Sequence, residues 1–228
     1  MKKYFVTGTD TGVGKTTVSC ALLAAAKARD LRTLALKPLA AGCAETPEGL
    51  RNDDALALLR VMTEPLSYAE VNPVALPAAL APHLAAQAAN RRLTIQRLGG
   101  FCRGALMRRA DFALVEGAGG WRVPISDREM LSALPKDLGL PVILVVGLRL
   151  GCLNHAVLTA EAILRDGLRL AAWVGNAIDP EMAALEANVE TLKNLLPAPC
   201  LGVLPWQPGA TPEERAAHLA PEALLGPG

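Results

Sequence analysis

A glycine-rich segment near the N-terminus, GTDTGVGKT at residues 8–16, carries the residue types of a phosphate-binding loop. It lies between a short β-prone run and a run with helical spacing, which is the context that such a loop requires. Backbone N–H groups of these loops point toward phosphate oxygens, and the following helix adds its positive N-terminal end. We therefore expect Lys15 to reach the β- and γ-phosphates of a nucleotide and the Thr16 hydroxyl to hold Mg²⁺. Five residues, instead of the usual four, separate Gly8 from Gly14, so an ordinary glycine-rich turn is the alternative.

Two acidic residues are candidates to complete a metal site. Glu116 ends the apolar run 112–115 and precedes the glycine-rich segment 117–120, where a ligand can approach the backbone. A carboxylate at this place could bind Mg²⁺ directly or through water. Asp54, near the start of a predicted helix, is the candidate for a further metal contact. The alternatives are a charged strand end for Glu116 and a plain helix cap for Asp54.

Lys37 follows the predicted strand 33–36. Ligands of open α/β sheets collect outside the C-terminal ends of the strands, so Lys15, Lys37 and Glu116 are predicted to share one crevice. A second cation beside the phosphates would neutralise charge that shifts during phosphoryl transfer. A lysine that merely ends a strand is the alternative.

Two later strand ends carry candidates for contacts with a base. Asn176 has an amide that both donates and accepts hydrogen bonds, which suits an adenine edge. Pro205 and Trp206 follow the last predicted strand and could form a wall for the base.

Strands that alternate with helices must position these residues. Apolar runs predict strands at 4–7, 33–36, 112–115, 142–146, 170–174 and 201–204, and helical spacing predicts helices at 16–29, 53–60, 93–109, 154–165 and 181–195. The run 142–146 is apolar throughout, as is typical of a parallel strand buried on both faces. We predict a three-layer, doubly wound α/β fold with a mostly parallel central sheet, in a single domain over residues 1–228. Residues 65–82 are predicted to be irregular, and the tail after Gln207 loosely ordered.

Composition argues against several classes of protein. Hydrophobic residues make up 51% of the chain, yet the longest strongly apolar run, 142–148, is far shorter than the ~20 residues of a membrane span. The N-terminus lacks the apolar stretch of a signal peptide, so we expect a cytoplasmic protein without membrane association. A net charge of +1 and 4% aromatic residues argue against nucleic acid as a partner. The five dispersed cysteines favour reduced, buried thiols.

Six segments resemble the dethiobiotin synthetase family, and the resemblance runs from about residue 3 to residue 206. The loop G-T-D-T-x-V-G-K-T and the segment L-G-C-x-N-H are together specific to that family, which shares the five-residue spacing. The segments are YFVTGTDTGVGKT (4–16), KPLAAG (37–42), TPEGLRNDDALAL (46–58), VEGAGGW (115–121), LPVILVVGLRLGCLNHAVLTAE (140–161) and LGVLPW (201–206).

The resemblance implies a P-loop NTPase-like fold and a ligase activity in biotin biosynthesis. The reaction of the family closes a ureido ring: 7,8-diaminononanoate (diaminopelargonate), CO₂ and ATP give dethiobiotin, ADP and phosphate. It passes through a carbamate and a carbamic–phosphoric anhydride, and it uses ATP and Mg²⁺. The resemblance also implies a homodimer in which the substrate site lies at the interface.

Matched residue by residue, the resemblance assigns roles. It makes Lys37 the catalytic lysine, beside Lys15 and Thr11, and it matches the metal ligands to Thr16, Asp54 and Glu116. The nucleotide contacts match Gly12, Val13, Gly14, Lys15, Thr16, Thr17, Asp54, Glu116, Gly117, Ala118, Gly119, Asn176, Ala177, Pro205, Trp206 and Gln207. The substrate contacts match Thr11, Lys37, Ala41, Gly151, Cys152, Leu153 and Asn154. The last four open a predicted helix, where free N–H groups suit a carboxylate tail.

Three positions need separate comment. Ala41 stands where the family often has a serine, and Asn188 stands where it has a tyrosine near the substrate tail. A lost hydroxyl contact costs on the order of 1 kcal/mol, so we expect activity with altered affinity or tail selectivity. His155 is interpreted as a helix-cap or interface residue, and proton transfer is the alternative.

Three other protein classes share parts of these motifs. A partitioning ATPase usually carries a lysine early in its loop, where this chain has Asp10. The run from Asn176 to Asp179 is similar to the guanine-reading N-K-x-D motif but lacks its lysine. An amidotransferase-type synthetase for corrin amides would need a glutaminase domain, for which 228 residues leave no room.

Overall fold

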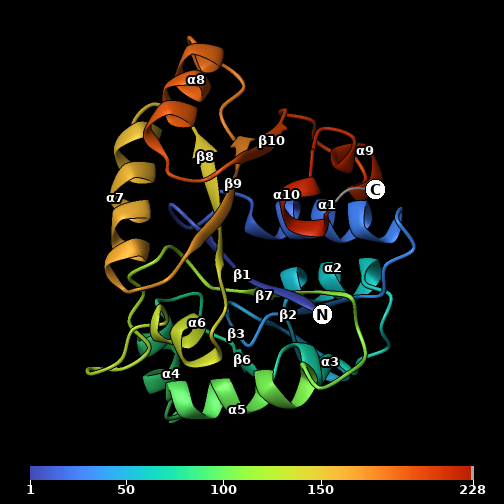
Figure 1. The fold of residues 1–228 in the computed structure, drawn as a ribbon. Coiled ribbons are helices and arrows are strands. Elements are labelled where there is room, and N and C mark those ends of the chain that lie inside the picture. The colour runs from blue at the N-terminus through green and yellow to red at the C-terminus, as the bar shows by residue number, and fades with distance from the viewer. Residues whose placement is uncertain (227–228) are drawn as a thin grey trace.

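The computed structural model describes residues 1–226, and a six-stranded sheet forms its centre (Figure 1). The strand order is β10-β9-β8-β1-β7-β2, and all neighbouring strands are parallel. The strands are β1 (Lys2–Gly8), β2 (Thr33–Leu36), β7 (Phe112–Glu116), β8 (Val142–Leu148), β9 (Leu170–Ala177) and β10 (Cys200–Leu204). From β1 the chain first moves to one edge of the sheet and later to the other. The loop after β1 therefore lies where the strand order reverses, the usual place for ligands in such sheets.

Helices cover both faces of this sheet and make three layers (Figure 1). One face carries α1 (Lys15–Lys27), α2 (Asp53–Val61), α9 (Pro212–Ala216) and α10 (Glu222–Leu225), and the other carries α5 (Ile95–Ala105), α6 (Ala133–Leu138), α7 (Cys152–Arg165) and α8 (Leu185–Leu195). Strands β7 and β8 are buried along their whole length, as parallel strands between two helix layers should be. The predicted three-layer α/β fold with a parallel central sheet is confirmed.

The predicted helix 93–109 is shorter in the structure, where α5 spans Ile95–Ala105, and the predicted start of α8 also differs. This helix begins at Leu185 and not at residue 181, because Ala184 has a φ of 53°, a left-handed conformation that a continuing helix cannot include. The remaining elements are β3 (Leu39–Ala41), β4 (Ala44–Thr46), β5 (Gly49–Arg51), α3 (Tyr68–Val71), β6 (Val74–Leu76) and α4 (Pro82–Ala88).

The prediction that residues 65–82 are irregular is wrong. Ser67 and Glu70 form a capping box that starts α3. The buried side chains of Val74 and Leu76 then place β6 beside β3 in a second, two-stranded parallel sheet. These elements are too short to show a periodicity in the sequence, but they fix the chain that follows Lys37.

The tail after Gln207 is also more ordered than predicted. Thr211 and Glu214 form a capping box at the start of α9, and Leu224 of α10 is buried. The Tyr4 hydroxyl donates a hydrogen bond to the carbonyl oxygen of Leu224 at 3.2 Å. Packing of the last helix against the first strand therefore orders residues up to 226, and the prediction of a loose tail is wrong for them; residues 227–228 lie outside the described part.

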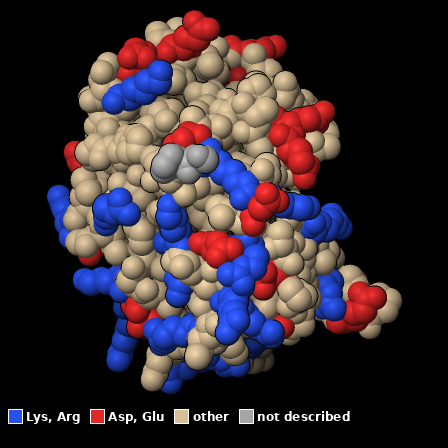
Figure 2. Space-filling view, turned by 45° about the vertical axis from the view of Figure 1, so that its right-hand side comes forward, with Lys and Arg blue, Asp and Glu red and all other residues tan. Residues whose placement is uncertain are grey.

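The surface charges and the cysteine thiols agree with what the composition of the chain predicts. Acidic side chains stand among the basic ones on the face shown in Figure 2, as the net charge of +1 suggests. Burial raises the pKa of the Cys20 and Cys102 thiols to about 12, so both stay protonated. No helix within residues 1–226 is long and apolar enough to cross a membrane.

Candidate active site

Glycine and Asn176 shape the loop between β1 and α1. Gly14 has a φ of 86°, and a Cβ at this position would lie 2.1 Å from Nδ2 of Asn176, so only glycine fits. The same Nδ2 atom donates a hydrogen bond to the carbonyl oxygen of Val13 at 2.9 Å. Asn176, expected at an adenine edge, therefore also braces the loop from the end of β9.

Lys15 begins α1, and its side chain crosses back over the loop. Its Nζ donates a hydrogen bond to the carbonyl oxygen of Asp10 at 3.0 Å. Burial, and after it the positive charge of Lys37, lowers the pKa of Lys15 to about 8. The Asp10 carboxylate forms an ion pair with Arg149 at 2.8 Å and accepts a hydrogen bond from the N–H of Thr11 at 2.7 Å. Asp10 thus anchors the loop through contacts that a lysine at this position would not make.

A buried cluster of charges lies where β2 and β7 end side by side. Lys37 follows β2, Glu116 ends β7, and Asp54 lies in the first turn of α2. The Lys37 Nζ is 2.8 Å from Oε1 of Glu116 and 2.9 Å from Oδ2 of Asp54. It also donates a hydrogen bond to the carbonyl oxygen of Gly117 at 3.1 Å. Three oxygen atoms therefore hold this ammonium group in the interior.

The charged states within the cluster support one another. Burial alone would lower the pKa of Lys37, but the Glu116 and Asp54 carboxylates outweigh it and raise that pKa above its usual value. Burial would likewise raise the pKa of Asp54, but the Lys37 ammonium outweighs it and holds that pKa below its usual value. Lys37 and Asp54 are consequently both charged near neutral pH.

Two hydroxyl groups of α1 complete the surroundings of Glu116. Thr16 donates a hydrogen bond to Oε1 and Ser19 donates one to Oε2, both at 2.7 Å. Residues three apart lie on the same helix face, so a single turn of α1 holds both carboxylate oxygens. Ser19 is fully buried, and the sequence analysis missed it. In the sequence, this serine stands on a helix face whose other residues are mostly apolar, and that pattern indicates a buried hydroxyl.

Thr16, Asp54 and Glu116 fit a magnesium ion by their chemistry. They offer one hydroxyl and two carboxylates: Asp54 and Glu116 contact the Lys37 ammonium, and the Thr16 hydroxyl contacts Glu116. Mg²⁺ prefers such oxygen ligands and usually takes one or two carboxylates together with phosphate oxygens.

A cleft of about 880 Å³ lies over the loop and the charge cluster. Lys15 and Lys37 both line it, and Glu116 lies below them in contact with Lys37. The predicted site residues that line the cleft are Thr11, Gly12, Gly14, Lys15, Thr16, Thr17, Lys37, Ala41, Asp54, Ala118 and Gly119. The sequence analysis did not foresee the apolar wall formed by Leu80, Pro82, Val123 and Pro124.

The other predicted contacts stand outside the lining of this cleft. Residues 151–154 lie at the start of α7, where Gly151 has a φ of 93°. Residues 205–207 follow β10, and the Trp206 side chain is half exposed. Neither segment is among the described residues that line the cleft of one chain. The two segments lie at different places, residues 151–154 at the start of α7 and residues 205–207 after β10.

Comparisons with known proteins identify the family of the chain. A family model described as an AAA domain matches residues 2–214. An ATP-dependent dethiobiotin synthetase from Marinobacter nauticus is 58% identical over 220 residues, covering 95% of this chain and 93% of that protein. The chain belongs to the dethiobiotin synthetase family. Synthetases of the same name from Cellvibrio japonicus and Xanthomonas campestris are 57% and 48% identical, over 98% and 95% of this chain and 98% and 96% of theirs.

Solved structures of lower identity share the fold of this synthetase family. A ParA family ATPase from Chlorobium tepidum has a TM-score of 0.57 at 12% identity, over 98% of this chain and 97% of its own. The MinC:MinD cell division complex of Aquifex aeolicus gives a TM-score of 0.56 at 17% identity, over 97% of this chain and 88% of that chain. These likenesses show a P-loop NTPase fold and no more than the fold.

The guanine-reading alternative finds no support in the geometry. The Asp179 side chain accepts a hydrogen bond from the N–H of Glu181 at 3.0 Å, which is a local turn. The Asn176 amide is bonded to the phosphate-binding loop, as described above.

Proposed function

We propose that the chain is an ATP-dependent dethiobiotin synthetase, a ligase that closes the ureido ring of dethiobiotin. It joins 7,8-diaminononanoate and CO₂ at the expense of ATP, which leaves as ADP and phosphate. The observation that carries the proposal is the pairing of a family identity of 48–58% with a cleft in which two buried lysines meet a phosphate-binding loop.

The loop would hold the triphosphate of ATP, with Lys15 reaching the β- and γ-phosphates. Thr16, Asp54 and Glu116 would hold Mg²⁺, which when bound neutralises phosphate charge. Asn176, Ala177 and residues 205–207 would contact the base, since they lie at the ends of β9 and β10 on the side of the loop. Thr11, Gly12 and the backbone of residues 117–119 would lie between nucleotide and substrate.

The chemistry consists mainly of positioning two anions beside each other. One amine of the substrate takes up CO₂ and becomes a carbamate. A carbamate oxygen attacks the γ-phosphorus, the bond to ADP breaks, and a carbamic–phosphoric anhydride forms. The second amine then attacks the carbonyl carbon, and phosphate leaves as the ring closes. Lys15 and Lys37 would supply the positive charge that the approach of carbamate and triphosphate requires.

Substrate binding would extend from Thr11 and Ala41 along the apolar wall of the cleft. The wall suits the alkyl chain of diaminononanoate, because it offers no hydrogen-bonding group that the chain would leave unpaired. Its carboxylate tail needs donors, and residues 151–154 offer the N-terminal N–H groups of α7. These residues do not line the cleft of their own chain, so we propose a homodimer in which the partner subunit supplies them. ATP as co-substrate points to the cytoplasm as the place of action.

The proposed activity is tested by incubating the full chain with diaminononanoate, bicarbonate, Mg²⁺ and ATP. We expect phosphate release that requires the diamine, together with dethiobiotin detected by mass spectrometry. Phosphate release that does not depend on the diamine would rule out the synthetase. The dimer is tested separately by sedimentation: a monomer at the assay concentration with full activity would contradict a shared substrate site.

A further inference from the structure

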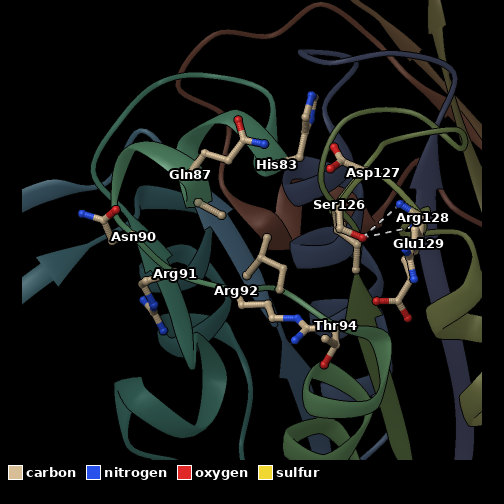
Figure 3. Close-up of a pocket in the computed structure, with 13 residues that line it drawn as sticks. His83, Gln87, Asn90, Arg91, Arg92, Thr94, Ser126, Asp127, Arg128 and Glu129 are labelled. Carbon is tan, nitrogen blue, oxygen red and sulfur yellow. Dashed lines mark hydrogen bonds between the residues drawn. The ribbon is translucent and has the colours of Figure 1, made fainter.

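A second cavity of about 580 Å³, called here the second pocket, lies beside the active-site cleft. It is framed by α4, by the segment that leads into α5, and by the turn of residues 125–129 (Figure 3). The same two segments of the chain separate the two cavities, with neighbouring residues facing opposite sides. Pro82 lines the cleft while His83 lines the second pocket, and Pro124 lines the cleft while Ile125 lines the pocket. Its volume lies in the range of small-molecule sites.

Two arginines of the second pocket, Arg92 and Arg128, have no carboxylate partner among residues 1–226. The arginine ion pairs of the described chain involve Arg29, Arg32, Arg103, Arg108, Arg122 and Arg149. In Figure 3 the Arg92 side chain runs along the lower side of the space toward Thr94. Unpaired guanidinium groups that border a cavity favour an anion with a planar pair of oxygens.

The two carboxylates near the pocket do not cancel this charge. Glu129 accepts a hydrogen bond from the N–H of Ile95 at 3.3 Å and so caps the start of α5. Asp127 is exposed at the rim, on the side of His83 in Figure 3. Arg91 donates a hydrogen bond to the carbonyl oxygen of Ala75, and its side chain points away from the space in Figure 3. Of the two carboxylates beside Arg92 and Arg128, one is therefore engaged by backbone and the other lies at the rim.

The rest of the lining combines an apolar floor with one buried polar atom that has no partner among the described residues. Ala86, Leu93 and Ile125 are buried and contribute the apolar surface. The Nδ1 atom of His83 is buried without a hydrogen-bond partner among the described residues. A buried polar atom without a partner is costly, and a ligand that forms a hydrogen bond with it would relieve that cost.

We propose that the second pocket binds a small aliphatic carboxylate. The carboxylate would pair with Arg92 and Arg128, and the alkyl chain would cover the apolar floor. The proposal rests on the lining of the pocket alone, so it does not depend on the synthetase reaction.

The test is calorimetric titration of the full chain with octanoate, with octanamide as the neutral probe of equal length. We expect octanoate to bind and octanamide to bind at least tenfold more weakly. The double variant Arg92→Gln/Arg128→Gln should weaken octanoate at least tenfold, while Arg109→Gln, an exposed arginine outside the pocket, should change nothing. Circular dichroism verifies that the exposed substitutions leave the fold intact.

Four outcomes would overturn the proposal. Equal binding of both probes would show an apolar cavity without anion recognition. Inorganic phosphate that displaces octanoate at equal concentration would show an anion site without an aliphatic part. Loss of octanoate binding in Ala41→Tyr, which fills the neighbouring cleft, would place the ligand there instead. Absence of binding at millimolar octanoate would show that the second pocket does not bind an aliphatic carboxylate. Dethiobiotin formation is assayed in parallel, so a failed synthetase and a failed pocket are told apart.

Discussion

Strands β2 and β7 carry an ion pair at each end, and the two pairs differ in almost every physical respect. The strands run parallel in the register Thr33 with Phe112 to Leu36 with Val115. Arg32 and Asp111 precede the strands, and Lys37 and Glu116 stand at their other end. The Arg32 and Asp111 side chains are 51% and 39% exposed, whereas those of Lys37 and Glu116 are 4% and 0% exposed.

The comparison shows how position at a sheet determines what an ion pair does. At the N-terminal ends water surrounds the pair, so its contribution to stability is small and falls with salt. At the C-terminal ends the helix layers and the phosphate-binding loop exclude water, so each charge depends on its partner. A basic residue beside β2 paired in register with an acidic residue of β7 or its flank therefore supports the surface at one end and a reaction centre at the other.

The largest effect is expected when the buried cation is removed. Lys37→Ala should lower turnover about 10²–10³-fold, because charge that develops on carbamate and phosphate loses a fixed ammonium group. Binding of a fluorescent ATP analogue should persist, since the loop and Lys15 remain. Steady-state dethiobiotin formation and nucleotide titration measure the two quantities.

Lys136→Ala, which removes an exposed lysine, is the matched control and should keep parental turnover. Normal turnover in Lys37→Ala would take the catalytic role away from Lys37.

The second effect concerns stability at the same end. Glu116→Gln leaves the Lys37 ammonium buried with Asp54 as its remaining carboxylate, so unfolding free energy should fall by about 3 kcal/mol. Urea unfolding followed by circular dichroism measures it. Adding Lys37→Met to Glu116→Gln should restore part of the loss, because the unpaired charge is then gone. A single Glu116→Gln variant as stable as the parent would show that the pair is not buried in solution.

The third effect is that of a positioning residue. Ser19→Ala removes the hydrogen bond to Oε2 of Glu116, which should cost about 2 kcal/mol because the acceptor is charged and buried. A carboxylate free to rotate should also hold Mg²⁺ more weakly, so the Mg²⁺ concentration that half-saturates nucleotide binding should rise.

Ser126→Ala is the control for this change. Ser126 accepts hydrogen bonds from backbone N–H groups in a partly exposed turn, so its loss should cost less and leave the Mg²⁺ dependence unchanged. Equal Mg²⁺ dependence in Ser19→Ala and the parent would reduce Ser19 to a stability role.

The sequence predicts the buried end of β2 and β7 well because two long-range rules coincide there. Apolar runs mark both strands, and a charged residue directly after each run places Lys37 and Glu116 at one edge of the sheet. The glycines, lysine and threonine of a phosphate-binding loop follow a spacing that rarely arises by chance. Fold class and the meeting of Lys37 with Glu116 therefore follow from local patterns combined with the general rule for parallel sheets.

Ser19, the order in residues 65–82 and the tail depend instead on tertiary contacts. The mostly apolar helix face around Ser19 indicates burial, but nothing in the sequence shows that its hydroxyl bonds a carboxylate 97 positions away. Elements of three or four residues show no periodicity, and Leu224 orders the tail through a strand at the opposite end of the sequence. The second pocket joins three separate segments, so no single stretch of sequence reveals it.

The smallest effect belongs to the exposed end of the strands and depends on pH. Hydrogen bonds from the side chain and backbone of Arg32 lower the pKa of Asp111 to about 2, from a usual value near 3.8. A lowered folded-state pKa adds stability that is fully present above the unfolded-state pKa and is lost as pH falls toward 2. Asp111→Asn should thus be slightly less stable than the parent at pH 7, by less than either buried variant, and the difference should shrink between pH 4 and pH 2. Urea unfolding across this range, at low salt and in 1 M NaCl, measures it. A difference that persists at pH 2 or survives high salt would mean that this end is buried too, and the contrast between the two ends would fail.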